Sequence, residues 1–182
     1  MSLNQPNTQS SDTSLTIRPE TPADYATVYE VNKLAFDNRD AEPKLVEALR
    51  DLPGVISLVA ELNGQVVGHI LFSPSYIETP NSNIPAISLA PLAVRPGYQN
   101  QGIGAALSRR GLDECQAQGH RIAIVLGHPN YYPRFGFSAL QARPLVCPWG
   151  DCGEAWMALE LAPGALEGVT GKVVYPKAFQ NV

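Results

Sequence analysis

Alternating apolar and polar residues predict strands in the first half of the chain. Residues 15–18 alternate in this way, and two longer apolar runs rich in β-branched residues, 55–62 and 65–73, are joined by Asn63-Gly64. A period of two is typical of a strand with one buried face. Because Asn-Gly suits the left-handed backbone of a two-residue hairpin, the two longer runs are predicted to pair antiparallel.

Apolar residues at helical spacing predict three helices. Thr-Pro-Ala-Asp at 21–24 supplies an N-cap, a proline for the first helical position and an acid for the first turn, and helical spacing follows over 25–35. Further helices are predicted over 42–51 and 103–118. Gly111 lies inside the last of these helices, where it costs about 1 kcal/mol relative to alanine, so we expect a close contact there.

A later strand, predicted over 84–94, is interrupted by proline. Pro91 has no backbone N–H to donate, so a bulge or a local loss of pairing is expected at the Ala90-Pro91 step. Such a bulge would leave backbone groups at 92–94 free to bind a ligand. Three shorter strands are predicted over 122–126, 155–161 and 173–175.

The order of these elements predicts one α+β domain. No internal repeat or linker interrupts the chain from 14 to 182. The preceding residues 1–13 are rich in Ser, Asn, Gln and Thr, and they are predicted to be a disordered tail.

The segment between the strand at 84–94 and the helix that follows it is rich in glycine. Gly97 and Gly102 have the spacing of a P-loop, but Ile103 and Gly104 stand where Lys and Ser/Thr are required. The dinucleotide fingerprint also fails, because its third glycine would fall at Leu107. A metal-free anion site remains, made by the free N–H groups of a helix start. An ordinary strand-to-helix turn is the alternative.

Composition narrows the class of protein. The net charge is −4 and the pI is near 5.3, which argues against nucleic acid as the main partner. No apolar run approaches the ~18 residues of a membrane span, and no signal-peptide core is present, so we expect a cytoplasmic protein. Cys115, Cys147 and Cys152 lack zinc-site spacing and are predicted to be thiols. His69 is predicted to be a packed or edge side chain, so no metal is expected.

Two motifs in a fixed order suggest a family. Leu92-Ala93-Val94 is followed by Gln99-x-x-Gly102-x-Gly104, and further along the chain stands Tyr132-x-x-x-Gly136-Phe137. In this order and spacing the chain resembles the GNAT (N-acetyltransferase) superfamily. The sequences of segments 91–94, 126–137 and 157–166 are most similar to the YhbS-like branch, and the resemblance covers roughly residues 15–179.

The resemblance implies a GNAT-like acyl-CoA N-acyltransferase fold. Its central sheet is mixed, mostly antiparallel and splayed in the middle, with helices on both faces. Acetyl-CoA would lie in the splay, where free amides at a helix start suit its pyrophosphate. Carried over by motif, the cofactor-binding residues are Leu92, Ala93, Val94, Gln99, Asn100, Gln101, Gly102, Ile103, Gly104, Ala105 and Asn130.

The implied reaction transfers an acetyl group from the CoA thioester to an amine. An amine attacks only when neutral, and a lysine-like amine has a pKa of about 10.4, so a base is needed. Tyr132 occupies the family position of the acid that protonates the leaving thiolate, with core packing as the alternative. His128 beside the splay is the candidate base. A loop histidine bonded to backbone, with a water chain as base, is the alternative.

The strand before the glycine-rich turn lacks a carboxylate that many relatives carry. Its inward candidates here are Ser88, Ala90 and Leu92. The loop between the first two helices lines the acceptor site in the family, so its acids could attract a cationic amine. A solvated acidic loop is the alternative. The residues concerned are Phe36, Asp37, Asp40 and Glu42.

Two functions remain open from the sequence. The first is an acetyl-CoA-dependent N-acetyltransferase acting on a small-molecule or peptide amine. The second is a catalytically inactive GNAT-like module that binds acyl-CoA as a sensor or scaffold. Substrate specificity would reside in the Phe36 loop and in segments 75–84 and 143–154. A homodimer is frequent in the family, and the sequence does not test it.

Overall fold

The computed structural model describes residues 14–181, so the tail predicted over 1–13 lies outside the described residues. The strands are β1 (Leu15–Pro19), β2 (Ile56–Leu62), β3 (Gln65–Glu78), β4 (Asn83–Val94), β5 (Ile122–Leu126), β6 (Leu145–Val146), β7 (Trp156–Glu160) and β8 (Gly171–Val174). The α-helices are α1 (Tyr25–Ala35), α2 (Ala41–Arg50), α3 (Ile103–Ala117) and α4 (Ala139–Ala142). The 3-10 turns are η1 (Pro22–Asp24), η2 (Tyr132–Phe135), η3 (Gly153–Ala155) and η4 (Lys177–Asn181).

The strands form one mixed sheet in the order β1-β2-β3-β4-β5-β7, with β8 pairing both β3 and β6. Neighbouring strands run antiparallel except for β4 with β5 and β6 with β8, which are parallel. The predicted mixed, mostly antiparallel sheet is therefore confirmed. The hairpin at Asn63-Gly64 is also confirmed, because both residues have positive φ, as the primed turn requires.

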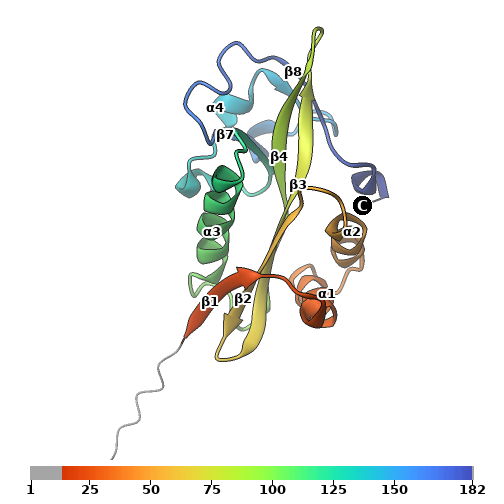
Figure 1. Ribbon diagram of the computed structural model, residues 1–182, viewed down its shortest axis with the longest axis vertical. Coiled ribbons are helices and arrows are strands. Elements are labelled where there is room, and N and C mark those ends of the chain that lie inside the picture. The colour runs from red at the N-terminus through yellow and green to blue at the C-terminus, as the bar shows by residue number, and fades with distance from the viewer. Residues whose placement is uncertain (1–13, 182) are drawn as a thin grey trace, which may run out of the picture.

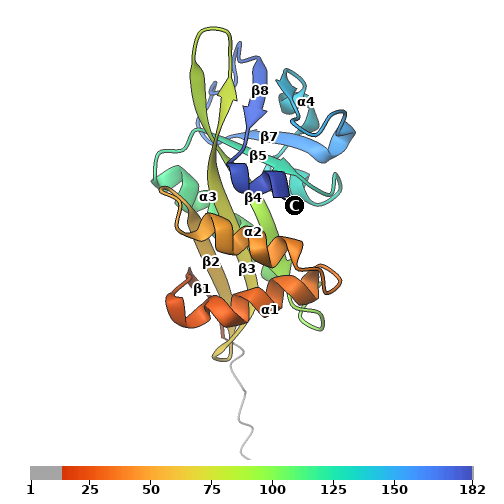
Figure 2. The same ribbon diagram turned by 90° about the vertical axis from the view of Figure 1, so that its right-hand side faces the viewer.

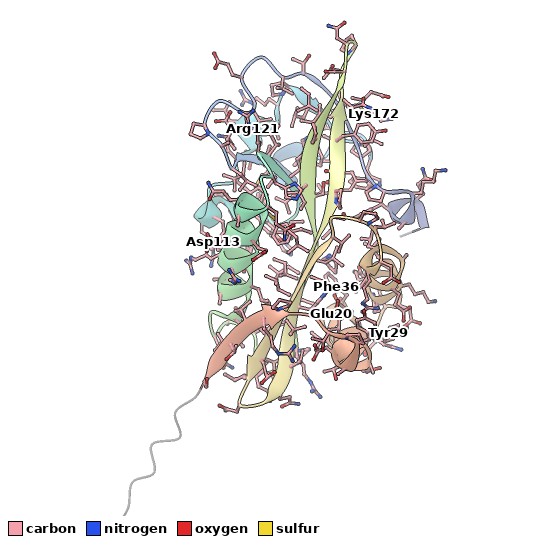
Figure 3. The ribbon with its side chains drawn as sticks, viewed as in Figure 1. Glu20, Tyr29, Phe36, Asp113, Arg121 and Lys172 are labelled. Atoms are coloured by element: carbon pink, nitrogen blue, oxygen red, sulfur yellow. A yellow bond between two sulfur atoms is a disulfide. The ribbon has the colours of Figure 1, made fainter. Side chains whose placement is uncertain are left out.

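Helices cover both faces of the sheet. α3 lies on one face, and α1 and α2 lie on the other (Figure 1, Figure 2). The side chains of Asp113 on α3 and Tyr29 on α1 mark these two outer layers (Figure 3). Because neighbouring residues of a strand point to opposite faces, Leu71 packs in the cluster under α1 and α2, while Phe72 packs under α3. Both side chains are fully buried.

Gly111 explains how closely α3 approaches the sheet. A Cβ at this position would overlap the ring of Phe72. The close contact predicted for this mid-helix glycine is confirmed.

His69 on β3 is buried, as expected. Its Nε2 lies 2.9 Å from the Ser57 hydroxyl and its Nδ1 lies 3.0 Å from the Asn32 side-chain amide. Burial lowers the pKa of His69 to about 3, so the ring is neutral at physiological pH. The side chain is therefore part of a structural polar network between α1 and the sheet.

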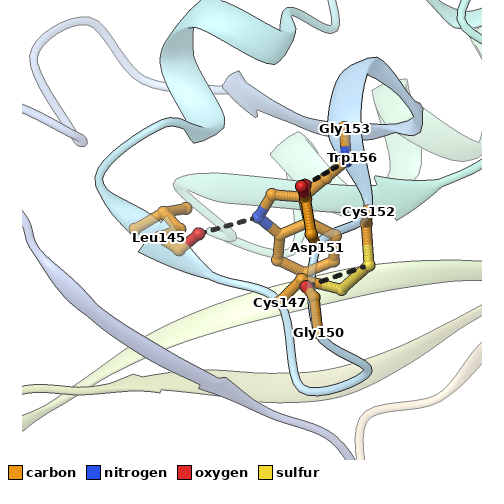
Figure 4. Close-up of a disulfide and its surroundings, with 7 residues drawn as sticks. All are labelled: Leu145, Cys147, Gly150, Asp151, Cys152, Gly153 and Trp156. Carbon is orange, nitrogen blue, oxygen red and sulfur yellow. Dashed lines mark hydrogen bonds between the residues drawn. A yellow bond between two sulfur atoms is a disulfide. The ribbon is translucent and has the colours of Figure 1, made fainter.

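The cysteine prediction was wrong for two of the three residues. Cys147 and Cys152 form a disulfide, while Cys115 is a buried thiol. The disulfide closes a short loop, and two hydrogen bonds lie next to it (Figure 4). The indole N–H of Trp156 donates to the Leu145 carbonyl at 3.0 Å, and the Gly153 N–H donates to Asp151 at 3.1 Å. Spacing rules address metal sites, and they could not show that the turn brings these two sulfurs together.

Within residues 14–181, no helix combines the length and the apolar character needed to cross a bilayer.

Candidate functional site

The sheet opens where β4 and β5 part. These strands pair only from Ile87 with Ala123 to Leu89 with Val125, and β5 ends at Leu126 while β4 continues to Val94. The splay implied by the family resemblance is thus present.

A bulge lies at the point where the two strands separate. β3 pairs Phe72 with Leu89 and Ile70 with Leu92, so Ala90 and Pro91 together oppose the single residue Leu71. The irregularity predicted from Pro91 is confirmed, and the Ala90-Pro91 peptide is cis. On the side facing the splay, β4 has no ladder partner beyond Leu89 among the described strands.

A cavity of about 620 Å³ fills the opening on the α3 side of the sheet. It brings together the end of β4, the glycine-rich turn and η2. The predicted residues that line it are Leu92, Val94, Gln99, Asn100, Gly102, Gly104, Ala105, His128 and Tyr132. The cavity is also lined by Tyr98, Tyr131 and Arg134, which the sequence did not single out.

The remaining predicted cofactor residues lie outside this lining. Ala93 and Ile103 are buried in the core, with 1% and 3% of their surface exposed. Gln101 and Asn130 are exposed, and the side-chain amide of Gln101 donates to the Gly97 carbonyl at 3.0 Å. The side chains of Gln101 and Asn130 thus support the turn or face solvent, and those of Ala93 and Ile103 pack in the core. The backbone of Ile103 belongs to the helix start described next.

The start of α3 presents free backbone donors. The N–H of Ala106 donates to the Gly102 carbonyl at 2.9 Å, which begins the helical ladder. The amides of Ile103, Gly104 and Ala105 precede that bond, and no side chain caps this helix. Gly102 has a φ of 83° that suits glycine. The turn is held by the Gln99 amide, which donates to the Val94 carbonyl at 2.9 Å.

Tyr132 is the most deeply placed polar side chain of the cavity. Only 8% of its surface is exposed, and its ring packs edge-on against Phe137 with ring centroids 5.8 Å apart. Gly127 makes room for it, since a Cβ there would overlap the Tyr132 ring. Burial raises the pKa of Tyr132 well above its ordinary value, so the hydroxyl keeps its proton.

Tyr131, next to Tyr132 in the sequence, was not among the predicted site residues. Its ring packs against Tyr132 and Phe135, but it also lines the cavity. The Arg134 guanidinium lies 4.6 Å from the Tyr131 ring centroid. The aromatic and basic residues around the Tyr132 motif were the signal available in the sequence, but the 3-10 turn sets where they point.

His128 lies beside Tyr132 at the end of β5. It is exposed and lines the cavity, and its carbonyl accepts a bond from the Tyr131 N–H at 3.0 Å. Ser88 is one of the three inward candidates on the strand that was expected to lack a carboxylate. Ser88 is fully buried and its hydroxyl lies 2.7 Å from that of Ser75.

A second cavity of about 350 Å³ lies on the α2 side of β4. Its walls come from α2, β4, the end of β5, the disulfide loop and the C-terminal segment. The lining residues are Glu42, Leu45, Leu89, Ala90, Leu126, Trp149, Tyr175 and Phe179. Of the predicted acidic-loop residues only Glu42 lines it, while Asp40 instead pairs with Lys33 at 3.1 Å.

The linings of the two cavities come close to each other at the splay. On β4, Ala90 lines the second cavity and Leu92 lines the first. At the end of β5, Leu126 lines the second cavity and His128 lines the first. On both segments, the residue that lines one cavity is therefore two positions away from the residue that lines the other.

Comparison with known proteins decides the family. The family model described as an acetyltransferase (GNAT) domain matches residues 16–140. This chain belongs to the GNAT acetyltransferase family. It is 35% identical over 168 residues to the uncharacterized N-acetyltransferase YhbS of Escherichia coli K12, across 91% of this chain and 98% of YhbS.

Solved structures of GNAT relatives share the whole fold. The crystal structure of E. coli YhbS in complex with CoA has a TM-score of 0.83 at 35% identity, covering 92% of this chain and 93% of that one. A GNAT family acetyltransferase from Brucella melitensis in complex with acetyl-CoA has a TM-score of 0.74 at 34% identity, covering 92% and 99%. The resemblance to the YhbS-like branch is confirmed. Within the described residues, no three His, Cys, Asp or Glu side chains are grouped as metal ligands would be.

Proposed function

We propose that this protein is an N-acetyltransferase that transfers the acetyl group of acetyl-CoA to an amine. The observation that carries the proposal is one cavity that joins the uncapped start of α3 to the largely buried side chain of Tyr132. An anion site without a metal suits the pyrophosphate of CoA. The CoA and acetyl-CoA complexes of the two relatives support the same donor.

The residues present fit acetyl-CoA. The amides of Ile103, Gly104 and Ala105 would hold the pyrophosphate, with Gln99, Asn100, Gln101 and Gly102 around it. The unpaired edge of β4 at Leu92, Ala93 and Val94 would bind the amide groups of the pantetheine arm in the manner of an added strand. Asn130 would lie near that arm.

The proposed chemistry is a direct transfer. A base removes a proton from the ammonium of the acceptor, the neutral nitrogen forms a C–N bond with the thioester carbonyl carbon, and the C–S bond breaks. The nitrogen then loses a second proton to solvent and the leaving thiolate takes one from solvent, so the products are an N-acetyl amide, CoA and the proton held by the base. His128, or water next to it, is the proposed base.

Tyr132 would act on the leaving sulfur. An ordinary thiol has a pKa of about 8.5, and the pKa of buried Tyr132 lies well above that, so complete proton transfer from Tyr132 is uphill. A protonated hydroxyl is nevertheless a ready hydrogen-bond donor to a developing thiolate. We therefore propose that Tyr132 stabilises the departing sulfur by a hydrogen bond, with solvent supplying the final proton.

An assay for free thiol with acetyl-CoA and a panel of amines tests the proposal. Amine-dependent release of CoA is expected, together with acetyl-CoA binding by calorimetry. Binding without release for any amine would instead establish the acyl-CoA sensor or scaffold. The cytoplasmic location and a homodimer stay predictions, which fractionation and light scattering would test.

A further inference from the structure

We infer that the second cavity binds the ammonium group of a small monoamine with an apolar, aromatic body, and that Glu42 is its charged partner. This assignment rests on the proposed function, whose acceptor it specifies. It follows from one carboxylate, three aromatic rings and the position of the cavity.

Glu42 supplies the negative charge. Its Oε1 accepts a bond from Arg39 at 2.8 Å, but its Oε2 is buried and has no hydrogen-bond partner among the described residues. Leaving a carboxylate oxygen buried without a donor is unfavourable. Glu42 is the one charged residue of the cavity lining. An ammonium group in the cavity would supply the missing donor and a compensating charge.

The walls around Glu42 suit an apolar ring. Trp149, Tyr175 and Phe179 form an aromatic cluster, with centroids 4.8 Å apart for Trp149 with Tyr175 and also for Tyr175 with Phe179. Trp149 is 47% exposed, which is high for so large an apolar side chain. Aromatic faces attract both apolar rings and cations.

The single charged residue of the lining and the small volume of the cavity favour a monoamine. A second ammonium or several hydroxyls would enter an apolar lining without partners, which disfavours diamines, polyamines and amino sugars. A volume of about 350 Å³ is at the small end for ligand sites. A compact arylalkylamine matches these limits better than a peptide, whose flanking polar backbone would also need donors and acceptors.

The cavity is positioned to deliver the amine to the donor. α2 and η4 lie side by side over the α2 face of the sheet (Figure 2). Ala90 and Leu126 form the end of the cavity that adjoins the splay, two residues from Leu92 and His128 in the first cavity. An amine bound in the second cavity would therefore lie next to the opening between β4 and β5.

The test compares 2-phenylethylamine with 1,4-diaminobutane, glucosamine and a short lysine peptide. Both CoA release and calorimetric binding in the presence of CoA are measured, so the amine site is tested even without turnover. Glu42→Gln keeps the size of the side chain, Glu42→Asp keeps the charge, and Glu47→Gln changes an exposed acid of the same helix as a matched control.

We expect 2-phenylethylamine to have the highest kcat/KM or the tightest binding. Glu42→Gln should raise its KM or Kd about tenfold or more, while Glu42→Asp recovers part of the loss and Glu47→Gln changes nothing. Acetyl-CoA binding should be unaffected in all three variants. Unchanged amine binding in Glu42→Gln, or a preference for the diamine, the amino sugar or the peptide, would overturn the inference. If the wild-type protein does not bind acetyl-CoA, this result would contradict the proposed function instead.

Discussion

Gly104 and Tyr131 meet across the first cavity: a Cβ on Gly104 would lie 2.8 Å from the Tyr131 hydroxyl oxygen. The glycine opens the α3 amides to the cavity, and the tyrosine, which immediately precedes η2, also lines it. Two segments far apart in sequence thus set the width of the proposed pyrophosphate site.

Gly104→Ala should weaken acetyl-CoA binding. The added methyl group would displace the Tyr131 hydroxyl and narrow the approach to the amides, so calorimetry should show a Kd higher by about tenfold, a change of roughly 1.4 kcal/mol. Alanine favours a helix over glycine by up to about 1 kcal/mol, so the free energy of unfolding should not fall. Tyr131→Phe combined with Gly104→Ala should restore part of the affinity. No recovery would show that the methyl group itself blocks the ligand.

Tyr132→Phe should lower turnover much more than binding. Loss of a hydrogen bond to the departing thiolate is expected to reduce kcat by roughly 10- to 100-fold with little change in the Kd of acetyl-CoA. Because burial raises the pKa of Tyr132, the wild-type hydroxyl stays protonated through neutral and mildly alkaline pH. Near pH 10, the kcat of the wild type should therefore fall no more than the kcat of the variant does. Unchanged kcat would remove Tyr132 from the mechanism.

Asp24→Asn should destabilise the fold at neutral pH. Arg18 donates two hydrogen bonds to Asp24, at 2.7 and 2.9 Å, and holds the pKa of that carboxyl well below its usual range. Since Arg18 is partly exposed, we expect a loss of about 1–2 kcal/mol in the free energy of unfolding by urea at pH 7.

The same pair gives a pH dependence of known sign. A carboxyl whose pKa is lowered by folding contributes its full stability above the unfolded value of about 3.9, and this contribution is lost as pH falls toward the folded pKa. The difference between wild type and Asp24→Asn should therefore shrink below about pH 4. Asp113→Asn, an exposed acid on α3 (Figure 3), is the control and should change stability little at either pH.

Removing the disulfide should destabilise the loop that carries Trp149. Cys147 and Cys152 are separated by five positions, and closure of so short a loop corresponds to about 2 kcal/mol in the chain-entropy account. Urea unfolding of the Cys147→Ser/Cys152→Ser protein should show a loss of this order, and it should match the wild type under reducing conditions. Alkylation followed by intact-mass measurement checks the pairing, and two free thiols at these positions in the oxidised wild type would contradict it.

Much of the first cavity could be predicted from local sequence. Gly102 and Gly104 at a strand-to-helix junction require a backbone with open amides, and Pro91 requires an interruption of the β3–β4 ladder. Both features depend on neighbours along the chain, so the local sequence predicts them. The side chains of Ala93 and Ile103 could not be placed by motif, because strand and helix geometry turn them into the core.

The second cavity could not be predicted in the same way. Its walls come from α2, β4, β5, the disulfide loop and η4, and no short motif links these segments. The sequence offered four residues of one loop as candidates for attracting an amine, and packing decided among them: of the four, only Glu42 lines the second cavity, while Asp40 pairs with Lys33.

The sequence alone determined the order of strands and helices up to β5, the bulge at Pro91, the uncapped helix start and membership of the acetyltransferase superfamily, because each depends on backbone chemistry and local spacing. Only the tertiary structure decided that Cys147 and Cys152 are joined, that Tyr131 lines the first cavity, and that Glu42, with one buried and unpartnered carboxylate oxygen, lines a second cavity beside an aromatic cluster. Those features arise where segments distant in the chain meet, and the side chains that fill such junctions are fixed by packing rather than by their neighbours in sequence.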